Sequence, residues 1–145
     1  MDFSMNVKEL LALYFERSNS MQIYWNFYIT IALALIAFFG GAKISINTKY
    51  LAGIISFAFF CFAFVNLGGL CEVAQQRTVA KEMIINSLQN PEDKAKIKPL
   101  TDNMNPPSVA GVVAVHLIGD IFVIGAIWFL ALKKEAGKPD KSTTE

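Results

Sequence analysis

Two ionisable residues stand out because they lie in the middle of an apolar stretch. His116 and Asp120 are four residues apart within residues 108–132, where Asp120 is the only acidic or basic residue besides the histidine. This spacing puts both side chains on one face of a helix. An imidazole beside a carboxylate can share or relay a proton. At bilayer depth such groups must face protein or water, because an ionised carboxylate costs roughly 2.5–3.5 kcal/mol there.

Three stretches of the chain are long and apolar enough to cross a bilayer. Hydrophobic residues make up 54% of the 145 residues, above the roughly 45–50% of an average soluble domain. Each stretch exceeds the roughly 20 residues that a spanning helix needs. We therefore predict an all-α integral membrane protein with a single membrane domain over residues 1–145. The three predicted transmembrane helices are residues 21–42, 50–71 and 108–132, and their alternating crossings predict a small antiparallel bundle.

The segments next to the first two helices also have helical patterns. Asn6 and Glu9 have the spacing of a capping box, and apolar residues then recur at helical spacing. We expect residues 1–20 to form an amphipathic helix on the membrane surface, ended by the polar residues 18–20. Aromatic residues at 24–28 are typical of the membrane interface. Helical periodicity continues through residues 72–89, which predicts a long second helix that extends beyond the bilayer.

The remaining segments are polar. Residues 90–107 contain four of the five prolines of the chain, and we expect an irregular loop there. Residues 133–145 are charged and polar, which is typical of a disordered tail. Basic residues are concentrated in the short first link and in this tail, which favours a cytoplasmic C-terminus and a multi-pass protein of a plasma or inner membrane.

Polar residues of the three predicted helices fall at matching depths. At about 1.5 Å per residue, Asn26, Asn66 and His116 lie roughly 6–8 Å from the midplane, and Thr30 and Asp120 lie close to it. We expect these five side chains to converge between the helices, because few polar groups can face lipid. Such a cluster would fix the register of the helices or, alternatively, form part of a path for protons.

Other chemistry finds little support in the sequence. A net charge of +1 gives no basic surface for nucleic acid, and no catalytic motif is present. Cys61 and Cys71 lie in one predicted helix about 15 Å apart, so they cannot bridge each other. A lone histidine without ligand-spaced partners predicts no metal and no cofactor. Glu72, where the second helix leaves the bilayer, is a candidate interfacial carboxylate.

These observations favour a protein that works by contact. We expect a small integral membrane protein that acts as an accessory or assembly subunit of a larger membrane complex or as a homo-oligomer, with residues 72–107 as its contact surface. The alternative is a homo-oligomeric channel or proton-coupled carrier that uses His116 and Asp120. A membrane-embedded enzyme is the third possibility.

Overall fold

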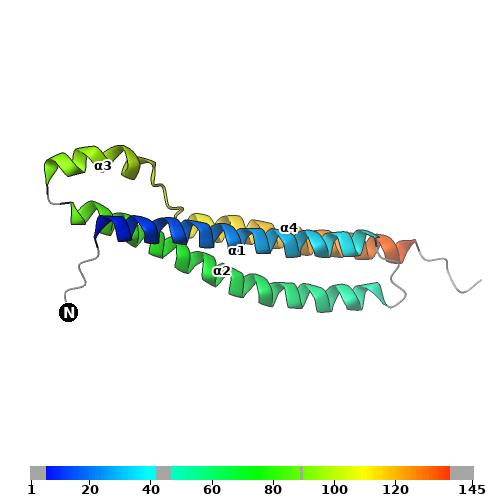
Figure 1. Cartoon of the computed structure of the whole chain (residues 1–145). Coiled ribbons are helices and arrows are strands. Elements are labelled where there is room, and N and C mark those ends of the chain that lie inside the picture. Colours follow the sequence, from blue (N-terminus) through cyan, green and yellow to red (C-terminus); the bar gives the residue numbers. More distant parts are fainter. Residues whose placement is uncertain (1–5, 42–46, 89, 138–145) are drawn as a thin grey trace, which may run out of the picture.

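The computed structural model describes residues 6–41, 47–88 and 90–137. This part of the chain contains helices and no strands. The three long helices lie side by side, and α3 lies at one end of them (Figure 1). The helices are α1 (Val7–Gly41), α2 (Thr48–Ser87), α3 (Pro91–Asn103) and α4 (Val109–Ala136).

Helix α1 differs from the expected arrangement because it is continuous. The predicted capping box is confirmed: Asn6 N–H donates to Glu9 Oε2 and Glu9 N–H donates to Asn6 Oδ1, both at 3.0 Å. The predicted end of an amphipathic helix at residues 18–20 is wrong. The Ser18 and Ser20 hydroxyls donate to the carbonyls four residues earlier, which lets serine remain inside a helix. Residues 7–20 are therefore the first part of α1.

Helix α2 confirms the predicted long second helix. Asn47 Oδ1 caps it by accepting from the backbone N–H groups of Lys49 and Tyr50, both at 3.1 Å. The helix then continues past Cys71 without interruption to Ser87. Helix α4 likewise matches the third predicted helix, with Ser108 Oγ accepting from Gly111 N–H at 3.1 Å. It extends four residues beyond the predicted end at Leu132.

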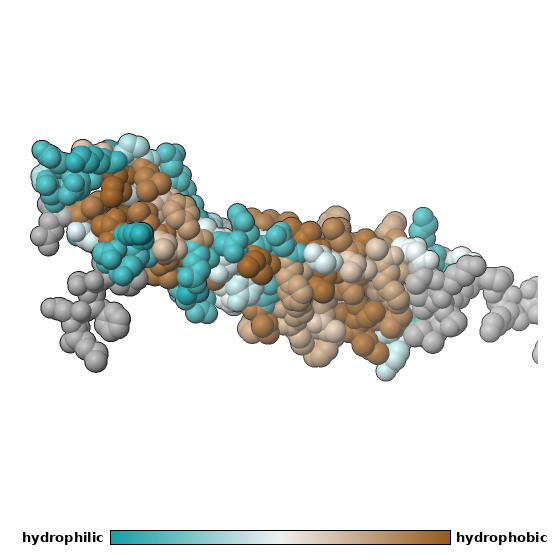
Figure 2. Space-filling view, in the orientation of Figure 1, coloured by the Kyte–Doolittle hydropathy of each residue, from teal (hydrophilic) through white to brown (hydrophobic). Residues whose placement is uncertain are grey.

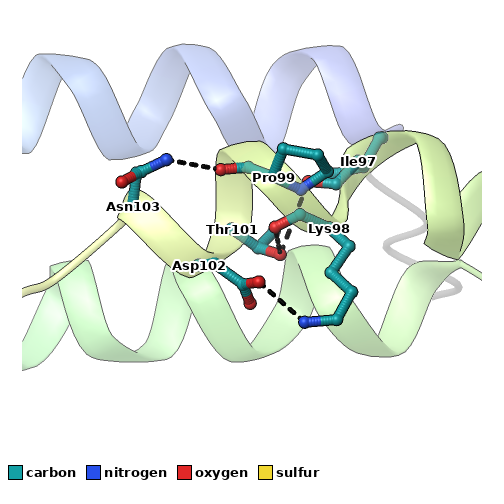
Figure 3. Close-up of polar contacts among 6 residues, drawn as sticks. All are labelled: Ile97, Lys98, Pro99, Thr101, Asp102 and Asn103. Atoms are coloured by element: carbon teal, nitrogen blue, oxygen red, sulfur yellow. Dashed lines mark hydrogen bonds and ion pairs between the residues drawn. The ribbon is translucent and has the colours of Figure 1, made fainter.

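The predicted loop at residues 90–107 is largely wrong, because Pro91–Asn103 forms helix α3. Asn90 caps this helix, and Pro91 occupies its first turn, where a missing N–H costs nothing. Pro99 lies inside the helix and removes one backbone bond, which is tolerable because the helix is mostly exposed. Figure 3 shows the bonds that reinforce its last turns, including Lys98 Nζ to Asp102 Oδ2 at 2.7 Å and Asn103 Nδ2 to the Pro99 carbonyl at 2.7 Å.

Three buried clusters hold the helices together. The largest joins α1, α2 and α4 through alanine, aromatic and branched aliphatic residues, including Phe39, Phe59 and Ile127. A second cluster joins the same helices further along, around Leu70 and Val112. The third joins the beginning of α1 to the end of α2, with Met104 from the connection after α3. We call residues 7–20 of α1, residues 72–87 of α2 and α3 together the head.

The outer surface has two different characters. Figure 2 shows hydrophilic side chains gathered at the end that carries α3 and hydrophobic side chains dominating further along the long helices. Large apolar side chains point outward there: Phe57 is 70% exposed, Phe64 is 72% exposed and Ile121 is 73% exposed. By length and composition α1, α2 and α4 can each cross a membrane. These features are consistent with a multi-pass membrane protein.

Candidate functional site

A chain of hydrogen bonds connects all three long helices. The Tyr28 hydroxyl of α1 donates to Asp120 Oδ1 at 2.8 Å. The other carboxylate oxygen, Oδ2, lies 3.0 Å from His116 Nδ1, one turn earlier on α4. On the far side of the ring, His116 Nε2 lies 3.3 Å from the Asn66 side-chain nitrogen on α2. We call Tyr28, Asn66, His116 and Asp120 the polar cluster.

The proton positions in the polar cluster depend on which way the Asn66 amide is turned. With the Asn66 amide nitrogen toward Nε2, this ring nitrogen accepts, so Nδ1 carries the proton and donates to Asp120. The carboxylate then accepts from both His116 and Tyr28. If the Asn66 amide turns over, its oxygen can accept from a protonated Nε2, and His116 Nδ1 and Asp120 then share a second proton taken up by the cluster. The cluster can therefore keep its hydrogen bonds with one proton or with two, provided that the Asn66 amide turns over when the second proton is bound.

Aromatic rings close the site around the histidine. His116 is fully buried, and 13% of the Asp120 side chain is exposed. The His116 ring centroid lies 4.4 Å from that of Tyr28 and 5.8 Å from that of Trp25. Such walls exclude solvent, which strengthens each hydrogen bond inside them.

A glycine gives Tyr28 room to reach the carboxylate. A Cβ built on Gly119 of α4 would lie 2.7 Å from the Tyr28 hydroxyl oxygen, closer than real Cβ atoms come. The absence of a side chain at Gly119 thus allows the phenol of α1 to lie against the backbone of α4. A similar contact occurs between α2 and α1, where a Cβ on Gly69 would lie 2.7 Å from two ring carbons of Tyr24.

The structure brings three of the five expected polar residues together and leaves two apart. Asn66, His116 and Asp120 meet as described, whereas Asn26 and Thr30 are exposed on α1. Thr30 Oγ1 donates to the Asn26 carbonyl at 2.7 Å within the same helix. The expected convergence of Asn26 and Thr30 on the cluster is therefore wrong. The reason is the rotation of α1: residues 26 and 28 are about 200° apart around a helix, and Tyr28 faces inward.

Tyr28 is the member of the cluster that sequence reasoning missed. Because Tyr28 is aromatic, its place in the sequence groups it with the residues at 24–28 that are typical of the membrane interface. The depth comparison that selected Asn26 and Thr30 applies equally to Tyr28, which lies between them. A search that counted a phenol as a buried polar group would have included it, because a buried tyrosine hydroxyl usually needs a partner.

Glu72 lies away from the polar cluster, in the head. It is exposed and accepts a 2.9 Å hydrogen bond from Gln76 Nε2, four residues along α2. It also lines a hollow of about 500 Å³ between α1 and α2, together with Arg17 and Met83. No second carboxylate lines this hollow within the part of the chain that the structure describes.

The chemistry available to the polar cluster is proton binding and hydrogen bonding. Within residues 6–41, 47–88 and 90–137, no group of three or more His, Cys, Asp and Glu residues lies close enough to hold a metal ion. The four side chains instead satisfy one another across α1, α2 and α4. Comparisons of the chain with protein-family models, with curated proteins and with solved structures find no match.

Proposed function

We propose that the chain is an integral membrane protein whose three long helices form an antiparallel bundle in the bilayer. Supporting this, α1, α2 and α4 are long and apolar enough to span, and Phe57, Phe64 and Ile121 point outward. Contiguous apolar surface of this kind would be unfavourable in water. The concentration of basic residues in the first link and the C-terminal tail favours a cytoplasmic C-terminus, and we propose a plasma or inner membrane.

We propose further that the protein acts through contacts made by its head. The observation that carries this proposal is a pair of hollows on the two sides of α2. One, of about 500 Å³, lies between α2 and α1, and the other, of about 520 Å³, lies between α2 and the start of α4. Gln75 and Val79 line both hollows. They form a ridge with a depression on each side, which suits a helical segment of a partner protein.

The residues around the hollows favour an amphipathic partner. Val79 is 52% exposed and Met83 is 41% exposed, so apolar side chains are available beyond the predicted spans. Charged side chains lie beside them: Arg17 and Glu72 line the first hollow and Glu82 lines the second. An apolar centre with a charged rim is the usual composition of a contact surface between proteins.

The head is held at a fixed height above the membrane. Both α1 and α2 run without a break from the predicted spans into the head. Arg77 of α2 fastens them together there, because its Nη2 donates to the Tyr14 hydroxyl at 3.1 Å and its guanidinium lies 5.0 Å from the Tyr14 ring centroid. A partner bound to the head would therefore be positioned relative to the bilayer, as an accessory or assembly subunit requires.

Photo-crosslinking in native membranes tests this proposal. A photoreactive amino acid at Val79 should give discrete protein adducts, whereas the same amino acid at Phe57, on the apolar face, should give lipid adducts. Val79→Arg should remove the complex seen after solubilisation in mild detergent, and Lys49→Gln, at the exposed start of α2 outside the head, should not. Lipid adducts alone at Val79, or an unchanged complex in Val79→Arg, would contradict the proposal.

The polar cluster favours a second candidate function, a proton-coupled carrier or channel. The supporting observation is that the cluster can satisfy its hydrogen bonds both before and after it takes up one proton. Three helices enclose no pore, so this function would require several copies of the chain. In vesicles containing a pH-sensitive dye, Asp120→Asn should abolish a pH-driven flux while the protein remains folded. Deletion of residues 91–99 should leave the flux intact and impair partner binding.

A further inference from the structure

One face of α1 carries polar side chains, and none of them forms a hydrogen bond to another helix within the described residues. Gln22, Asn26 and Thr30 follow each other at intervals of four residues, and all are exposed. The side-chain amides of Gln22 and Asn26 form no hydrogen bond within the described part of the chain. We call the face around these residues the amide stripe.

The amide stripe lies at the level of the polar cluster. Asn26 directly follows Trp25, whose ring contacts His116, and precedes Tyr28 by two residues. His116 itself lies seven residues into α4, about 10 Å along its axis. Asn26 therefore lies inside the proposed bilayer, roughly 6–8 Å from its midplane. An amide without a hydrogen-bond partner is unfavourable in a hydrocarbon environment.

The stripe continues along α1 as a regular seam. Positions seven residues apart return to almost the same side of a helix. Exposed residues recur at this seven-residue spacing along α1. Gln22 and Ile29 are also exposed, and each lies three residues after a member of the series. The seven-residue series consists of Asn19, Asn26, Leu33 and Gly40. Leu33 is 61% exposed and Ile29 is 49% exposed, so large apolar side chains are available beside the amides.

The opposite side of α1 is packed in the interior of the molecule. Met21, Tyr28, Ala32 and Phe39 are buried against α2 and α4. Residues 26 and 28 differ by about 200° around the helix. The amide stripe consequently faces away from the bundle, with its whole length free for another helix.

We propose that the amide stripe binds the same stripe of a second copy of this chain. Copies inserted in one orientation place their α1 helices parallel, and a two-fold axis then brings Asn26 opposite the same residue of the second copy. A carboxamide is self-complementary, because its nitrogen donates and its oxygen accepts. Asparagine in a seven-residue seam selects an identical partner and fixes the register of parallel helices. No charged side chain lies on the stripe between Arg17 and Gly41, so a charged partner would gain no ion pair.

Close approach of the two helices is possible at the far end of the seam. Ala37 is exposed and small, and nothing lies within 4 Å of a Cβ built on Gly40. Small residues let transmembrane helices approach each other, and amide side chains then bond across the interface. The inference requires the membrane placement proposed above, but it does not require that the head bind a partner.

Dimerisation in lipid vesicles tests the inference. Full-length protein labelled with a donor or an acceptor dye is reconstituted over a range of protein-to-lipid ratios, and energy transfer gives the dimer dissociation constant. Asn26→Leu should raise this constant about tenfold, and Asn26→Gln, which keeps the amide, should stay within about threefold of the unchanged protein. Thermal unfolding of the monomer should be unchanged, because Asn26 is exposed and its side chain forms no hydrogen bond to another helix within the described residues.

Cysteine crosslinking locates the interface. In a background with Cys61→Ala and Cys71→Ala, Leu33→Cys should give a disulfide-linked dimer in membranes, and Phe57→Cys on α2 should not. Val79→Arg should leave this dimer intact, which separates failure of the proposed contact head from failure of the dimer. Any of the following results would overturn the inference: energy transfer absent at every ratio, an unchanged dissociation constant in Asn26→Leu, a dimer through Phe57→Cys instead, or a different protein linked at Leu33→Cys.

Discussion

The Tyr28 hydroxyl donates a 2.8 Å hydrogen bond to Asp120, a residue 92 positions away in the chain. This bond joins the first long helix to the last, and it places a phenol against the one carboxylate that lies among apolar residues. The same carboxylate binds His116, which in turn lies beside Asn66. Loss of this single hydrogen bond should therefore weaken the packing of all three long helices.

Tyr28→Phe measures how much this hydrogen bond contributes to the free energy of unfolding. The substitution removes one oxygen and leaves the ring, so the free energy of unfolding should fall by about 1–3 kcal/mol. Trp25 lies 5.8 Å from His116, and its fluorescence during denaturation in detergent can report the change. The matched control is Tyr50→Phe, because Tyr50 is 70% exposed, and it should alter the free energy by less than about 0.5 kcal/mol. Equal effects at the two sites would contradict this reading.

Gly119→Ala should push the phenol away from Asp120. The new Cβ would lie 2.7 Å from the Tyr28 hydroxyl oxygen, so we expect a loss of about 1–3 kcal/mol in unfolding free energy. Gly125→Ala, on the same helix with nothing within 4 Å, should instead stabilise by up to about 1 kcal/mol.

The two substitutions at Gly119 and Tyr28 should be strongly non-additive. In the Tyr28→Phe background the clashing oxygen is absent, so Gly119→Ala should cost much less there than in the unchanged protein. The double-mutant cycle is measured by the same denaturation in detergent. Simple additivity would show that Gly119 and Tyr28 do not act through the same contact.

Gly69→Ala and Gly68→Ala compare two neighbouring glycines of α2. A Cβ on Gly69 would lie 2.7 Å from the Tyr24 ring, whereas nothing lies within 4 Å of one on Gly68. Tyr24 is 37% exposed, so its ring can turn outward. Gly69→Ala should therefore be less stable than Gly68→Ala by about 1 kcal/mol, a smaller penalty than at Gly119. A lower melting temperature for Gly68→Ala would refute the assigned packing.

Arg77→Lys should loosen the head without affecting the spans. Lysine cannot reproduce the planar contact with the Tyr14 ring or the forked donors of the guanidinium. Backbone amides of residues 7–20 should exchange with deuterium about tenfold faster, equivalent to roughly 1.4 kcal/mol of local stability. Amides of residues 21–41 should be unchanged. Lys94→Gln serves as the control, and equal acceleration across α1 would argue against a local role for Arg77.

Several features of the fold could be predicted from residue order because their causes are local. The capping box at Asn6 and Glu9 and the length of α2 past Cys71 depend on neighbours within one or two helical turns. Two local predictions failed for local reasons as well. Serines at 18 and 20 bonded back to their own helix, and the exposed α3 accepted Pro99.

For the candidate site, the sequence predicted the position of polar side chains along their helices but not which side of each helix faces inward. Counting residues at 1.5 Å each was sufficient to align Asn66 with His116 on different helices, because rise along a helix is nearly constant. It could not tell which side of α1 faces inward. Inside a bilayer, polar side chains do not mark the outer face of a helix as they do in water, so Asn26 and Tyr28 were equally eligible from sequence.

The sequence by itself determined three apolar helices, their approximate limits and the height of each polar side chain, because length, hydrophobicity and helical rise are properties of the chain alone. Only the tertiary structure decided that Tyr28 completes the polar cluster while Asn26 faces outward. That choice depends on how side chains of one helix fit the surface of another, and here the space above Gly119 admits the phenol.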